Sequence, residues 1–154
     1  MGYLIGWVVV VLIVHGVLGA MRFTRGRGAA LDRDERGLRA IQAGSGLLIA
    51  AFVAYHLAHL WGLDAEPHGS ARAVYAALWS GLGQPLQLGI YLLGLSLACF
   101  HFGHGLSRAA ISLTAAPTPA TKLVLRVAAG AIGFGLWALW LQVLAHFAIG
   151  QRLF

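Results

Sequence analysis

The stretch that decides the fold is residues 85–113, which reads PLQLGIYLLGLSLACFHFGHGLSRAAISL. It contains no charged residue before Arg108, although it includes His101 and His104. A helix that crosses a bilayer needs roughly 20 mostly apolar residues, and this stretch supplies them. Proline is also favoured in the first turn of a helix. The stretch therefore predicts a membrane-spanning helix that begins at Pro85.

Three further apolar stretches, residues 3–22, 41–62 and 124–150, are also long enough to span. Over the whole chain of 154 residues, 59% are hydrophobic and 10% are charged. About a quarter of the residues in a soluble domain are charged, so water is not the expected solvent. We expect an all-α integral membrane protein, a four-helix bundle that forms one domain over 1–154. A short interfacial helix is expected at 71–82.

The formal net charge of +6 comes from basic residues that gather at the ends of the predicted spans. Most lie between the first two spans or beside the third loop, which the positive-inside rule places in the cytoplasm. Both termini are therefore predicted outside. Nucleic-acid binding is not expected, because no basic and aromatic face lies outside the lipid. These basic residues are Arg22, Arg25, Arg27, Arg33, Arg36, Arg39, Arg108, Lys122 and Arg126.

The first span is interpreted as a retained helix and not as a signal peptide, because its arginines follow it and do not precede it. Cys99 is the only cysteine and lies in the middle of a predicted span. One cysteine cannot form a disulfide framework, and no Cys-x-x-Cys-His motif is present for covalent haem attachment.

Histidine is the most informative residue type in this sequence. An ionisable side chain in hydrocarbon is costly, which makes it a candidate functional residue. The alternative for any single histidine is a hydrogen bond to a neighbouring helix. Six of the seven histidines fall within predicted spans, namely His15, His56, His59, His101, His104 and His146.

Two of these histidines share one depth in the membrane. His15 precedes Arg22 by seven residues, and His101 precedes Arg108 by seven. Each imidazole is therefore expected about 10 Å inside the cytoplasmic boundary. Two imidazoles at one depth can ligate one iron from opposite sides, and the arginines can neutralise haem propionates. Ordinary snorkelling to the interface is the alternative role for the arginines.

A glycine follows each of these histidines by four residues, at Gly19 and Gly105. Position i+4 lies on the same helix face, so each glycine leaves room for a flat macrocycle beside its ligand. The pattern alone is weak, because 21 of the 154 residues are glycine.

His56 lies farther out than this pair. It follows Arg39 by 17 residues, about 25 Å along a helix, so it cannot share their iron. A second haem at this depth needs another ligand, and His146 is the internal candidate. For His59 and His104 we expect hydrogen bonding or quinone contact in preference to ligation.

Three segments together resemble a known family. Residues 41–46 (IQAGSG) followed by His56 resemble a Gln/Arg-x-x-Ser/Thr-Gly…His segment, and the order Pro, Tyr91, His101, Gly-Leu resembles a Pro…Tyr…His-x-x-x-Gly-Leu segment. Residues 15–23 (HGVLGAMRF) resemble the end of the second helix in the same family. The family is the single-subunit, dihaem cytochrome b anchors of succinate dehydrogenases and menaquinol-fumarate reductases.

The resemblance implies that His15 and His101 ligate a haem b near the cytoplasm and that His56 ligates an outer haem. Family members usually have five spanning helices, and the first supplies the outer haem's other histidine. This chain is expected to begin at the helix that corresponds to the family's second. The outer haem is then either absent or completed by His146 or by a partner chain.

The resemblance also implies the function. The chain would not be catalytic alone; it would anchor a flavoprotein and an iron–sulfur subunit at the cytoplasmic face of a bacterial membrane, and transfer electrons to or from quinone, expected to be menaquinone. A further small membrane subunit is a candidate partner. Gln42 and Ser45 are expected to bond haem propionates or quinone, with helix packing as the alternative.

Two other functions stay open from the sequence. One is a transporter or an ion or proton channel lined by histidines. The predicted spans contain no Asp or Glu, which counts against it, because hard cations and proton relays generally use carboxylates. The other is a haem b subunit of a different membrane dehydrogenase.

Overall fold

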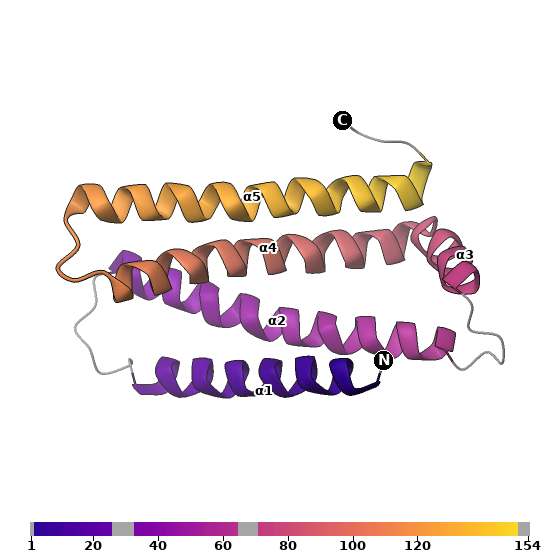
Figure 1. Cartoon of the computed structure of the whole chain (residues 1–154), viewed down its shortest axis with the longest axis horizontal. Coiled ribbons are helices and arrows are strands. Elements are labelled where there is room, and N and C mark those ends of the chain that lie inside the picture. Colours follow the sequence, from indigo (N-terminus) through magenta and orange to yellow (C-terminus); the bar gives the residue numbers. More distant parts are fainter. Residues whose placement is uncertain (1, 26–32, 65–70, 151–154) are drawn as a thin grey trace. The chain divides into compact units, whose positions relative to one another are not determined.

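The structure is a computed structural model that describes residues 2–25, 33–64 and 71–150. Every element in these ranges is helical, which confirms the all-α prediction. In chain order they are α1 (Gly2–Arg25), α2 (Arg33–Asp64), α3 (Ala71–Leu82), α4 (Pro85–Leu113) and α5 (Pro119–Ile149) (Figure 1).

The chain divides into two compact units. The first, Met1–Leu47, contains α1 and the start of α2, and the second, Leu48–Phe154, contains the rest of α2 with α3, α4 and α5. The boundary falls inside α2. Each unit is described by itself below.

In the described residues, three of the four predicted spans are helices long and apolar enough to cross a membrane, which indicates a multi-pass membrane protein, while the fourth span and the four-helix bundle stay predictions. These segments are Gly37–His59 within α2, all of α4 and all of α5. The apolar part of α1, Val9–Met21, is shorter. The interfacial segment predicted at 71–82 is helical over that whole range, as α3.

The starts of two helices were predicted too late by five or more residues, because hydropathy locates the apolar part of a helix and not its ends. The helix predicted from residue 41 begins at Arg33, so it includes a charged run. The helix predicted from residue 124 begins at Pro119. Thr118 is its N-cap, and its hydroxyl accepts a 3.1 Å hydrogen bond from the Thr121 amide. Pro119 is thus the first residue of α5.

In the second unit, α4 and α5 run side by side and antiparallel (Figure 1). Gly103 and Gly133 face each other where the helices meet. A Cβ on Gly103 would lie 3.1 Å from the carbonyl oxygen of Ala129. A Cβ on Gly133 would lie 3.0 Å from the carbonyl oxygen of Cys99. Glycine allows this backbone contact, which is how helices associate closely in lipid.

A hydrogen bond on the same interface reinforces the pair. The Trp137 indole Nε1–H donates to Ser96 Oγ at 2.9 Å. The Ser96 hydroxyl in turn donates to the Leu92 carbonyl oxygen at 2.7 Å. The Trp137 indole and the Ser96 hydroxyl therefore both have hydrogen-bond partners within the two helices.

The short helix α3 packs against the ends of both long helices. Leu82 is buried with Tyr91 and Leu144. At the end of α5, Gly150 adopts a left-handed conformation with φ 69°, and its amide bonds the His146 carbonyl oxygen. Glycine is the usual residue at such a helix end. A Cβ there would lie 3.5 Å from the Trp79 ring of α3.

Candidate functional site

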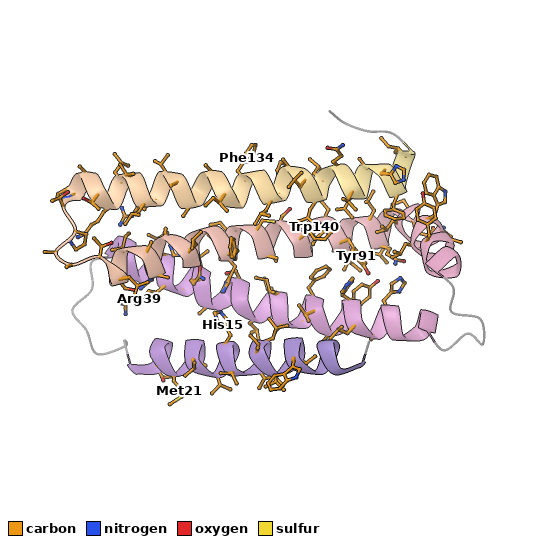
Figure 2. All side chains as sticks on the ribbon, viewed as in Figure 1. His15, Met21, Arg39, Tyr91, Phe134 and Trp140 are labelled. Atoms are coloured by element: carbon orange, nitrogen blue, oxygen red, sulfur yellow. The ribbon has the colours of Figure 1, made fainter. Side chains whose placement is uncertain are left out.

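The candidate site lies between α4 and residues 48–64 of α2. Side chains of α2 reach across to α4, and one of them, Phe52, lies against the α4 backbone at Gly94. Its central bond joins His56 Nδ1 and Tyr91 Oη at 3.0 Å. Tyr91 is only 5% exposed and lies on the side of α4 that faces α2 (Figure 2).

Aromatic rings from α2 surround the Tyr91 ring. The centroid of Phe52 lies 5.5 Å from that of Tyr91 with the planes at 89°, and His56 lies at 5.6 Å and 74°. Tyr55 and His59 lie at 6.2 Å and 6.3 Å. These edge-to-face arrangements are the favoured geometry for aromatic pairs. The Tyr91 ring is therefore held on several sides.

Gly94 makes room for one of these rings. A Cβ at this position would overlap the Phe52 ring, so the ring lies directly against the α4 backbone. From there Phe52 stacks on His56, with centroids 6.0 Å apart and planes at 26°. Phe52 thus supports both partners of the central hydrogen bond.

A second polar pair lies one turn farther along α2. His59 Nε2 and Gln87 Nε2 are 2.8 Å apart, and the amide N–H of Gln87 can donate to the unprotonated ring nitrogen. Tyr55 stacks on His59 with centroids 6.1 Å apart and planes at 9°. The Gln87 amide also lies against Gly81, where a Cβ would come within 2.8 Å of its nitrogen. This fits the hydrogen-bonding role predicted for His59.

His146 forms a separate contact between α5 and α3. Its Nε2 lies 3.1 Å from Tyr75 Oη. The rings of Trp79 and Phe147 lie 5.8 Å and 5.6 Å from the His146 ring. The histidine predicted as an internal ligand for an outer haem is therefore engaged with α3 in this structure.

The other predicted residues divide between the two units. In the first unit, His15 and Gly19 lie on the exposed surface of α1, and a Cβ on Gly19 would meet nothing within 4 Å. On α2, Ser45 is 4% exposed, and its hydroxyl donates to the Gln42 carbonyl oxygen at 3.0 Å. Arg22 belongs to α1, and its side chain lies outside the described part of the structure.

In the second unit, α4 carries His101, Gly105 and Arg108. His101 and Gly105 are half-buried, and Arg108 is exposed. The predicted ligation of one iron by His15 and His101 joins residues of different units, and it stays a prediction.

The candidate membrane-spanning segments Gly37–His59, α4 and α5 contain histidines and no Asp or Glu. Neutral imidazole is the kind of side chain that haem iron takes as an axial ligand. In the ranges that the structure describes, no three His, Cys, Asp or Glu side chains converge on a metal ion. That finding bears on a metal ion held by protein alone, whereas a haem iron takes only its axial ligands from side chains.

Sequence reasoning gave no role to several residues of this site. Tyr91 was noted only as part of a family pattern, and Gln87 and Phe52 were not singled out. Gln87 could have been found as a polar residue in an apolar helix, where a buried partner is needed. Phe52 has no such signal, because an aromatic residue in a span is ordinary.

No family model, curated protein or solved structure matches this chain.

Proposed function

We propose that this protein is a haem b-binding membrane anchor of a succinate:quinone oxidoreductase, either a succinate dehydrogenase or a fumarate reductase. The observation that carries the proposal is the placement of histidines on apolar spans that contain no carboxylate. Neutral imidazoles in hydrocarbon suit haem iron, whereas cation transport generally uses carboxylates. The motif order quoted above supports the specific family.

The chain's own residues would hold the cofactor in place. His15 and His101 are the proposed axial ligands of the haem nearer the cytoplasm, with Arg22 and Arg108 beside its propionates. Gln42 and Ser45 are further candidates to bond propionates or quinone. His56 is the proposed ligand of an outer haem. When bound, haem b supplies a one-electron carrier between an iron–sulfur subunit and the quinone.

The aromatic surroundings of His56 support a ligand role at that position. A ligating imidazole generally has its second ring nitrogen hydrogen-bonded, which fixes the ring's orientation. The hydrogen bond between Nδ1 and Tyr91 Oη would meet this requirement in the tautomer whose Nδ1 carries the proton, and Nε2 would then be the atom for iron. His59, bonded to Gln87, is a candidate contact for the quinone head group at the same end of α2.

The proposed partners are a flavoprotein and an iron–sulfur subunit on the cytoplasmic face of a bacterial membrane, with menaquinone as the proposed quinone. The chain alone would not oxidise succinate. An additional small membrane subunit could supply the ligand that completes the outer haem.

The first experiment is a reduced-minus-oxidised spectrum of the full chain purified from a membrane, with haem quantified per polypeptide as pyridine haemochrome. We expect a haem b band that His101→Leu reduces by about one haem per chain. The matched control is Phe102→Leu, which alters the exposed neighbour of His101 and should leave haem content unchanged. No haem b band in the unaltered chain would refute the proposal.

A second experiment tests the enzyme class. Affinity purification from the native membrane should recover a flavoprotein and an iron–sulfur subunit with succinate dehydrogenase or fumarate reductase activity. Recovery of a different dehydrogenase would keep the haem assignment and reject the proposed partner.

A further inference from the structure

The loop end of the helix pair α4 and α5 carries three basic side chains and no acidic one. Arg108 lies in the last two turns of α4, and Lys122 and Arg126 lie in the first three turns of α5. All three side chains are exposed. Residues 85–150 contain no Asp or Glu, so neither helix nor the loop between them offers these cations an acidic partner.

The contact between the two helices places Arg108 and Arg126 at one level. Gly103 of α4 meets the α5 backbone at residues 129–133. Measured from the middle of this contact, each arginine lies about five residues, or about 7.5 Å, toward the loop. His104 interacts electrostatically with both arginines, so the two charges lie close to one half-buried imidazole.

Like charges at one level of an apolar helix pair repel each other, and the repulsion falls when an anion binds between them. Lys122 precedes Arg126 by four residues and therefore lies on the same face of α5. The alternative is that each cation only extends into water, as basic side chains at helix ends commonly do. In that case the cations would hold no particular lipid.

Apolar side chains beside the two cations of α5 provide a surface for acyl chains. Leu123 and Val127 directly follow Lys122 and Arg126, and each is 63% exposed. Basic sites between membrane helices bind anionic lipid head groups. A lipid would use both features, because its phosphate would meet the cations and its acyl chain the apolar residues. A free phosphate ion would use only the first.

We infer that the loop end of α4 and α5 binds the phosphate of an anionic phospholipid in the membrane leaflet at that end of the helices. Lys122 and Arg126 contact the phosphate, and Arg108 adds its positive charge from the facing helix. Neither residue of α5 has a part in the proposed haem function, so the site does not rest on that function.

The test uses the full chain in a neutral detergent, titrated with phosphatidylglycerol or with phosphatidylcholine and read by native mass spectrometry. The unaltered chain should bind one phosphatidylglycerol more than tenfold tighter than phosphatidylcholine. Lys122→Gln and Arg126→Gln should each weaken phosphatidylglycerol binding by about fivefold and leave phosphatidylcholine binding unchanged.

Two variants and one competitor serve as controls. Arg126→Lys keeps the positive charge and should keep the preference for phosphatidylglycerol. Arg72→Gln removes one charge from α3, which packs at the opposite end of α4 and α5, and should leave both affinities unchanged. Inorganic phosphate at the concentration of the lipid should not displace phosphatidylglycerol.

Three results would overturn the proposal. One is equal affinity of the unaltered chain for the two lipids. Another is an equal loss in Arg72→Gln and Arg126→Gln, because the attraction would then follow net charge and not this site. The third is displacement of the lipid by inorganic phosphate, which would make a free anion the occupant.

Discussion

Helix α4 contacts its two long neighbours in different ways. Against α5 it presents Gly103, and the backbones of the two helices touch. Against residues 48–64 of α2 it presents Tyr91 and Gln87, which hydrogen-bond the two histidines, and Gly94, on which the Phe52 ring lies. A glycine of α4 thus admits a helix backbone on one face and an aromatic ring on the other.

The difference separates a packing interface from a candidate site. Close backbone contact stabilises helices in lipid but leaves no room for anything between them. At the contact with α2, imidazole, phenol and amide groups meet across the two helices. His56 and His59 lie at this second kind of contact, and each is hydrogen-bonded to a side chain of α4.

The largest expected effect concerns the glycine contact. Gly103→Leu should lower the free energy of unfolding by about 3 kcal/mol, because the new side chain would strike the Ala129 carbonyl and force the helices apart. Titration of the chain from mild detergent into SDS measures the change. Gly130→Leu is the matched control, since a Cβ there meets nothing within 4 Å. Equal losses in both variants would contradict the packing role of Gly103.

An intermediate effect is expected at the ring contact. Phe52→Ala should cost about 2 kcal/mol, because it empties the space between Gly94, His56 and Tyr91. The same SDS titration applies. Phe134→Ala should cost less than about 0.5 kcal/mol, because Phe134 is 67% exposed and projects from the side of α5 away from α4 (Figure 2). A larger loss at Phe134 would mean that the exposed face of α5 is covered.

The smallest effect tests the hydrogen bond between α4 and α5. Trp137→Phe removes the donor to Ser96 and should cost about 0.6 kcal/mol, the average for such bonds in membrane helices. The Ser96 hydroxyl keeps its bond to Leu92, so no buried donor is left unpaired. Trp140→Phe, at a half-exposed indole on the same helix, is the control. A loss at Trp137 larger than the loss measured for Gly103→Leu would show that the Trp137 contact, and not the glycine contact, dominates this interface.

Much of the fold could be predicted from the sequence, because a bilayer demands long apolar helices. The bounds of α4 and α3 match the predicted ranges. The start of α2 was missed because Arg33 and the charged residues after it are helical without being apolar. The start of α5 was missed although Thr118 and Pro119 form a recognisable helix start.

The candidate site was less predictable. The sequence identified His56 as a residue of interest, because an imidazole in an apolar span is unusual. Its bond to Tyr91, 35 positions away, depends on how α2 and α4 are rotated about their axes. No local pattern specifies that rotation. The same holds for the pairing of His59 with Gln87 and of His146 with Tyr75.

The contact between His146 and Tyr75 occupies one ring nitrogen of α5 with a side chain of α3. Because His146 Nε2 is already bonded to Tyr75, any other group that binds this nitrogen must displace the tyrosine hydroxyl. Binding at that nitrogen would weaken the docking of α3, and displacement of α3 would free the nitrogen. The two equilibria are thermodynamically linked through one nitrogen atom.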